Sequence, residues 1–154
     1  MQAADGSFIS SSYWTDGVGP AAALAVLEKV RRLDVFTLVW QRGERLQAAL
    51  REVAARHPLC RLTIGSMPAT PTLTFGLGDD TSLAQALFVR KLRERGILLS
   101  GICYLMLAHD EAKIPLLLDA VDQVLGEIGQ TIARGTLAEE TGLPRTRRGF
   151  TRLA

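Results

Sequence analysis

A change in hydrophobic periodicity near residue 58 constrains the fold of this chain more than any other feature. Before it, over residues 20–32 and 34–57, apolar side chains recur every three or four positions, which is typical of amphipathic helices. After it, the stretches "CRLTI" (60–64) and "TPTLTFG" (70–76) alternate and carry β-branched side chains, which is typical of short strands. The pattern predicts two helices followed by two strands.

The rest of the chain returns to helical spacing. A third helix is expected from Thr81 or Ser82 to Arg95, with Gly96 ending it. The apolar run 97–107 is expected to hold one or two buried strands. Asp110 is placed to cap a last long helix, whose core face reads Ile114, Leu117, Val121, Val124 and Ile128.

This order of elements predicts an α+β fold, in which a small, mostly antiparallel sheet packs with helices and is preceded by two helices. The length of 154 residues fits one domain of ordinary size. From residue 135 onward Gly, Pro, Thr and Arg recur without apolar periodicity, so residues 135–154 are expected to form an irregular tail.

The charge balance excludes several classes of partner. The net charge is only +2, so neither a nucleic acid nor an acidic membrane is expected as a partner. No leader-like segment and no apolar run of spanning length is present, which favours a cytoplasmic protein. Neither Cys60 nor Cys103 has a second cysteine or a histidine at metal-ligand spacing, and both are interpreted as buried thiols in a reducing compartment.

Candidate catalytic groups are few, and no catalytic residue and no metal site is predicted. His57 stands at a helix end, where interaction with the helix dipole is the simplest role. His109 precedes the Asp110 cap and is expected to act as a local hydrogen-bond partner. The two histidines do not have metal-ligand spacing. The lysines, which are Lys29, Lys91 and Lys113, all fall among charges on helix surfaces.

A run of hydroxyl side chains, which includes Ser10, Ser11 and Ser12, lies shortly before the helix start at Gly19-Pro20. Helix N-termini attract anions and hydroxyl groups add donors, so a phosphate group could bind there. The alternative is a hydroxyl-rich loop without a ligand. Composition alone favours that alternative.

Four segments, in order, resemble class III aminotransferases, which are fold-type-I pyridoxal-phosphate (PLP) enzymes related to glutamate-1-semialdehyde aminomutases. "FISSSYWTDGVGPAAALAVLEKV" (8–30) resembles the family's segment after the PLP lysine, and "GSMPATPTLTF" (65–75) resembles its small-domain strand pair. "ALFVRKLRERGILLSG" (86–101) and "LMLAHDEAKIPLLLDAVDQVL" (105–125) resemble its later helix and strand and its closing helix. The resemblance covers roughly residues 7–130.

The resemblance implies that the chain is the C-terminal part of such an enzyme and lacks the lysine that forms the imine with PLP. Residues 1–33 would be a remnant of the large PLP-binding domain, 34–134 the C-terminal α+β small domain and 135–154 the tail. In the family, the position of Ser12 contacts the cofactor phosphate across a dimer interface, and Ser11 is its neighbour. Asp16-Gly17 replaces the family's Glu-Arg, which puts any interaction of that arginine in doubt.

Two functions from different classes follow from these observations. The first is a portion of a PLP-dependent aminotransferase or aminomutase, inactive alone, whose partners are a second copy or the missing PLP-lysine domain. Its substrates would be an amino-group donor and acceptor. The second is a free-standing α+β interaction or small-ligand-binding domain without catalysis.

Overall fold

The structure is a computed structural model that describes residues 16–110 and 112–144. These residues divide into two compact units, one before Thr37 and one from Thr37 onward. The first contains helix α2 (Val18–Arg32) and the start of helix α3 (Val35–Arg56). The predicted division at residues 33–34 and the assignment of 1–33 to a larger domain stay predictions.

Both N-terminal helices begin and end where the sequence predicts. The carboxylate of Asp16 accepts a hydrogen bond from the Val18 N–H at 2.9 Å, so it satisfies one free donor of the first turn of α2. α3 begins directly after Asp34 and ends just before His57-Pro58. No residue of α2 is buried, whereas α3 buries one face that includes Leu46, Leu50 and Val53.

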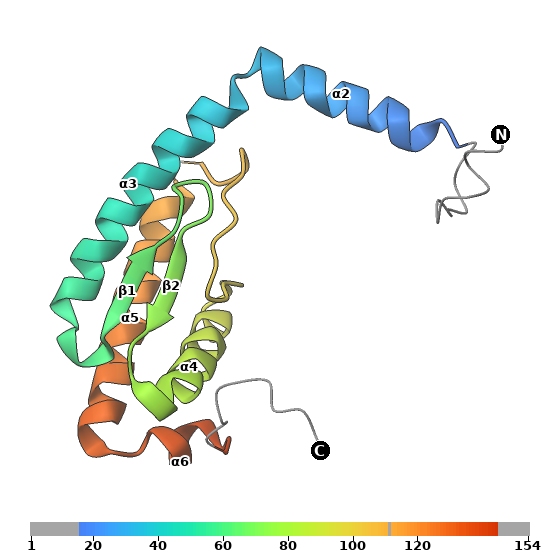
Figure 1. Cartoon of the computed structure of the whole chain (residues 1–154). Coiled ribbons are helices and arrows are strands. Elements are labelled where there is room, and N and C mark those ends of the chain that lie inside the picture. Colours follow the sequence, from blue (N-terminus) through green and yellow to red (C-terminus); the bar gives the residue numbers. More distant parts are fainter. Residues whose placement is uncertain (1–15, 111, 145–154) are drawn as a thin grey trace. The chain divides into compact units, whose positions relative to one another are not determined.

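The second unit is built around an antiparallel pair of strands (Figure 1). β1 (Leu62–Gly65) pairs with β2 (Thr72–Phe75), with Leu62 opposite Phe75 and Gly65 opposite Thr72. Short 3₁₀ turns precede the sheet at Pro58–Cys60 and follow it at Gly78–Asp80. The predicted α+β fold with a small antiparallel sheet is confirmed.

The prediction of regular strands within residues 97–107 is wrong. Residues 101–105 do run antiparallel beside β2, because the N–H groups of Leu73, Cys103 and Leu105 bond to Gly101, Pro71 and Ala69 respectively. The pairing yields only the isolated bridge between Thr72 and Ile102. Pro71 has no N–H to return the bond that it accepts from Cys103, and this interrupts the ladder.

Three further helices complete the second unit: α4 (Thr81–Glu94), α5 (Lys113–Arg134) and α6 (Leu137–Thr141). α4 contacts β2, α5 and α6. Gly96 and Gly135 follow α4 and α5 with φ angles of 77° and 72°, a conformation that glycine adopts without strain. α6 corrects the expectation that the chain is only loop after residue 134, because its buried Leu137 packs on the main core.

One continuous core lies between α3, the sheet, α4 and α5. Its fully buried large side chains are Phe75, Phe88, Leu46, Leu50, Leu73, Leu83, Leu87, Leu92, Leu125, Ile128, Val121 and Val124. Phe75 and Phe88 meet edge to face, with ring centroids 5.6 Å apart. The predicted core face of α5 is confirmed at Val121, Val124 and Ile128, which are completely buried.

Candidate functional site

The residues with a predicted cofactor contact, Ser11 and Ser12, lie outside the described residues. What the structure describes of that region is the helix that follows them. α2 begins at Val18 and has Gly17 at its N-cap, without a capping side chain at that position. The expected helix start shortly after the hydroxyl run is therefore confirmed.

His57 has a tertiary partner that the sequence did not indicate. Its Nε2 lies 2.7 Å from a carboxylate oxygen of Asp122 on α5, and Arg56 contacts the same oxygen at 3.2 Å. The His57 side chain is only 21% exposed. The interpretation of His57 as a surface residue facing its own helix end is thus corrected, since the ring joins the end of α3 to α5.

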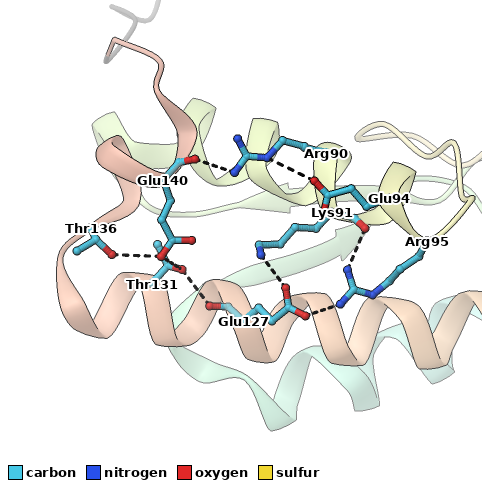
Figure 2. Close-up of polar contacts among 8 residues, drawn as sticks. All are labelled: Arg90, Lys91, Glu94, Arg95, Glu127, Thr131, Thr136 and Glu140. Atoms are coloured by element: carbon cyan, nitrogen blue, oxygen red, sulfur yellow. Dashed lines mark hydrogen bonds and ion pairs between the residues drawn. The ribbon is translucent and has the colours of Figure 1, made fainter.

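Lys91 is not on an open helix surface, as the sequence suggested, but between two helices (Figure 2). Its Nζ lies 2.7 Å from Glu127, its side chain is 19% exposed, and Arg95 pairs with the other oxygen of the same carboxylate. The hydrogen bond from Lys91, with the two cations nearby, holds the pKa of Glu127 below its usual range. This three-residue cluster fastens α4 to α5.

Lys113 also has a carboxylate partner. Asp110 accepts hydrogen bonds from the backbone N–H groups of Ala112 and Lys113, and its other oxygen lies 2.5 Å from Lys113 Nζ. The Lys113 hydrogen bond lowers the pKa of the Asp110 carboxyl group. Asp110 therefore accepts from N–H groups at the start of α5, as a capping side chain does, although Ala112 is the residue at the N-cap. Its charge offsets that of Lys113.

One concave feature of the second unit is an apolar hollow of about 780 Å³. We use the name apolar hollow for the space that segment 96–106 and the start of α5 enclose, with Leu46 and Val89 in its wall. Several of its large side chains are exposed: Leu98 at 88%, Leu116 at 66% and Tyr104 at 63%. The apolar run 97–107 was expected to form buried strands, so the exposure of Leu98 and Tyr104 corrects that expectation.

His109 lines the apolar hollow. Its Nδ1 is buried and has no hydrogen-bond partner among the described residues. The local bond that was expected of the ring is absent at this atom, although the backbone N–H of His109 bonds to Met106 at 3.1 Å. A buried ring nitrogen without a partner is uncommon in folded proteins.

Both thiols are buried and unpaired, as predicted. Burial raises the pKa of Cys60 to about 11, and its Sγ donates to the carbonyl of Leu125 at 3.2 Å. Burial also raises the pKa of Cys103, which lines the apolar hollow. A thiol with a raised pKa is a poor nucleophile, so neither cysteine fits a catalytic role.

Within residues 16–110 and 112–144, no cluster of histidine, cysteine or carboxylate side chains has the arrangement of a metal site. Across the same residues, no helix combines the length and the apolar character that a membrane crossing requires. The described part of the chain thus offers two features for functional reasoning: the polar cluster around Glu127 and the apolar hollow.

Comparison with known proteins gives one structural likeness. No protein-family model matches the chain, and no curated protein matches it in sequence. The fold is similar to the structure of the PLP internal aldimine form of the FumI protein from Sphingopyxis sp. MTA144, with a TM-score of 0.72 and 22% sequence identity. The match covers 86% of this chain and 32% of that chain.

The chain therefore spans about a third of the length of the protein that it matches. At this level of identity the likeness establishes the fold. The α+β arrangement inferred from the sequence is thus found in part of a solved structure.

Proposed function

We propose that this chain is the C-terminal portion of a PLP-dependent class III aminotransferase or aminomutase and supplies its small α+β domain. One observation carries the proposal: 86% of the chain follows the fold of a protein whose structure is a PLP form. The four resembling segments, which occur in the family's order between residues 8 and 125, support it independently.

The described residues do not provide a complete site for PLP. Lys91 is bonded to Glu127 and Lys113 to Asp110, so both amines are already engaged by carboxylates. Attachment of PLP requires a neutral lysine amine next to the aldehyde carbon. We therefore propose that the lysine comes from a part of the enzyme outside this sequence and that the chain alone is inactive.

In the assembled enzyme, Ser11 and Ser12 would contact the cofactor phosphate, and the enzyme would act as a homodimer. α2 begins at Val18, six residues after Ser12, and the positive end of its dipole favours a nearby anion, although the Asp16 carboxylate already accepts from the Val18 N–H. A cytoplasmic location belongs to the same proposal, since both cysteines are unpaired, as is usual in reducing compartments.

A second candidate function is a free-standing domain that binds a small ligand without catalysis. The apolar hollow favours it, because a concave, mostly apolar space with few polar groups is the usual form of a ligand site. The two candidates differ in whether a lysine-bearing polypeptide accompanies the chain.

The native protein tests this difference. An antibody raised against residues 37–144 should detect, in the source cells, either a polypeptide about three times as long as this chain or a complex with a second chain that carries a PLP lysine. The sequence upstream of the coding region should correspondingly encode that lysine domain. A native polypeptide of 154 residues that purifies without such a partner, encoded beside unrelated genes, would contradict the proposal.

A further inference from the structure

Beside the Glu127 cluster and the apolar hollow, the second unit has a groove between α3 and β1. We use the name edge groove for this space of about 380 Å³, which is lined by Arg51, Ala54 and Ala55 from α3 and by residues of the segment 57–64. Among the described residues β1 pairs with β2 alone, and the bridge to Ile102 lies on the other side of β2. The edge groove therefore borders the free edge of the sheet.

Two residues of β1 that line the edge groove, Leu62 and Ile64, direct backbone groups away from β2. Ile64 stands opposite Leu73, whose N–H turns away from β1 and donates to Gly101 at 2.8 Å. In an antiparallel pair, opposite residues point their backbone groups either both toward each other or both outward, so those of Ile64 point outward. The same holds for Leu62, because the direction alternates along a strand. These outward N–H and C=O groups have no hydrogen-bond partner among the described residues, and such groups are a template for a further strand.

The charges of the edge groove are positive and lack a counter-charge. The guanidinium group of Arg61 has no partner among the described residues, and Arg51 donates to the neutral amide oxygen of Gln47 at 3.2 Å. The remaining titratable group of the lining, the His57 ring, is already bonded to the Asp122 carboxylate at 2.7 Å. In the described part of the chain, no carboxylate side chain lines the groove itself. A ligand with negative charge would therefore complement it.

The free strand edge selects among negatively charged ligands. A small carboxylate or a sulfate ion only accepts hydrogen bonds, so it would leave the outward C=O groups of Leu62 and Ile64 without partners. An extended peptide offers both N–H and C=O groups at strand spacing and pairs with both kinds. Peptide binding by strand addition therefore fits the backbone groups and the arginines together.

We propose that the edge groove binds an extended acidic segment of a partner polypeptide, which adds a strand to β1 and places carboxylates beside Arg51 and Arg61. The backbone pairing gives the segment its direction and register, and the two arginines select its charge. This site needs no PLP, so it goes beyond the function proposed above. It would exist both in a free-standing domain and in a portion of a larger enzyme.

The probe for the first experiment is a blocked seven-residue peptide in which glutamate alternates with valine, titrated into the isotopically labelled full chain. Nuclear magnetic resonance should show saturable one-to-one binding, with shifts concentrated in residues 51–64. The amide hydrogens of Leu62 and Ile64 should exchange more slowly in the bound state, because they gain hydrogen bonds. That of Thr63, which faces β2, should change little and is the internal reference. Absence of saturation, or unchanged exchange at Leu62 and Ile64, would overturn the proposal.

Matched variants separate the edge groove from general surface charge. Arg61→Gly removes one guanidinium group, and the φ angle of 46° at this position suits glycine, so the fold should persist. Arg51→Gln removes the other group, and each variant should bind the glutamate peptide about fivefold more weakly. Arg93→Gln loses the same charge at an exposed position of α4 outside the groove and should bind as the parent chain does. Equal affinity of the three variants, with amide spectra that show intact folds, would contradict the role of the arginines and with it the proposal.

Two altered peptides distinguish strand addition from binding of a charge alone. A peptide with lysine in place of glutamate should bind at least about tenfold more weakly, because its charges face two arginines. The glutamate peptide methylated at its interior backbone nitrogens keeps its carboxylates but cannot donate to the C=O groups of β1, so it should also bind about tenfold more weakly. Undiminished binding of the methylated peptide would identify a site for small anions instead. Self-association in light scattering that the glutamate peptide does not displace would identify a second copy of the chain as the occupant of the edge.

Discussion

Glu127 lies where charged side chains from two helices meet, and it shows how one residue can fasten elements that are distant in the sequence. Lys91 on α4 and Arg95, which directly follows the last residue of α4, take one oxygen each of its carboxylate (Figure 2). One turn further along α5, the Thr131 hydroxyl bonds to the Glu127 carbonyl and to Glu140, whose own carbonyl accepts from Arg90. These contacts join α4, α5 and α6.

The Glu127→Gln substitution should destabilise the protein by about 1 kcal/mol at neutral pH, a figure kept small because the side chain is 38% exposed. The pKa of Glu127 is lowered in the folded state, so its stabilising effect is complete above the ordinary value of 4.5. That effect disappears as the pH falls through the lowered folded pKa. Thermal unfolding of parent and variant from pH 7 to pH 3 measures the difference, which should shrink on the acid side.

Glu94→Gln is the control for this experiment. Glu94 pairs with Arg90 at 4.0 Å on the exposed side of α4, so its substitution should change stability by less than about 0.5 kcal/mol at any pH. If the difference in stability between the parent and Glu127→Gln stayed constant down to pH 3, packing rather than the ionised carboxylate would account for the loss of stability.

Gly43 offers a second test at the residue scale. A Cβ atom at this position of α3 would lie 1.9 Å from the carbonyl oxygen of Pro68, so the helix and the turn before β2 must move apart. Gly43→Ala should therefore cost about 1–3 kcal/mol of stability, although alanine is the better helix former. Urea denaturation measures the change.

Gly129→Ala in α5 is the matched control, because its Cβ would meet only Cys60 Sγ, at 3.9 Å. That variant should gain up to about 1 kcal/mol from helix propensity alone. If Gly43→Ala and Gly129→Ala changed the stability by the same amount, the close approach of Gly43 to Pro68 would not exist in solution.

At the scale of elements, the two longest helices and α2 differ in what stabilises them. α3 and α5 each run for 22 residues and bury a continuous face in the core. α2 runs for 15 residues and has no buried residue, although Leu24 and Leu27 are apolar. Helical stability in proteins comes mainly from packing of an apolar face, so α2 relies on local interactions.

We therefore expect amide hydrogens of residues 20–32 to exchange much faster than those of residues 116–128. The reason is that an isolated helix of about 15 residues is marginal in water. Hydrogen exchange followed by mass spectrometry or NMR measures both helices in one sample, with α5 as the internal reference. Equal protection of the two helices would contradict this expectation and would mean that something covers α2.

At the scale of the whole molecule, the described lysines decide what chemistry the chain can perform. Two of the three, Lys91 and Lys113, are engaged by carboxylates, and Lys29 lies exposed near the end of α2. PLP added to the purified chain should thus give no stoichiometric attachment at one lysine and no amino-group transfer.

Borohydride reduction followed by peptide mass spectrometry measures this attachment. Lys29→Arg, Lys91→Arg and Lys113→Arg are the matched variants, since arginine keeps the charge but cannot form the bond. One-to-one labelling of a single lysine, with turnover that disappears in the corresponding arginine variant, would show that the chain is an enzyme by itself.

The sequence by itself determined most helix positions, the strand pair and much of the core. The spacing of Val121, Val124 and Ile128 predicted the buried face of α5, and Asp110 predicted its cap, because helix periodicity and capping depend on residues close in the chain. Gly96 similarly marked the end of α4. α6 was missed because five residues are too few to show a periodic pattern.

Only the tertiary structure decided which distant residues meet. The partners of His57 and Lys91, which are Asp122 and Glu127, lie 65 and 36 residues away, and no local pattern encodes such pairs. The apolar hollow likewise arises from tertiary packing, which no local sequence pattern encodes. An apolar run predicts burial on average, but whether Leu98 is covered depends on what packs beside it, and that is a property of the fold rather than of the run.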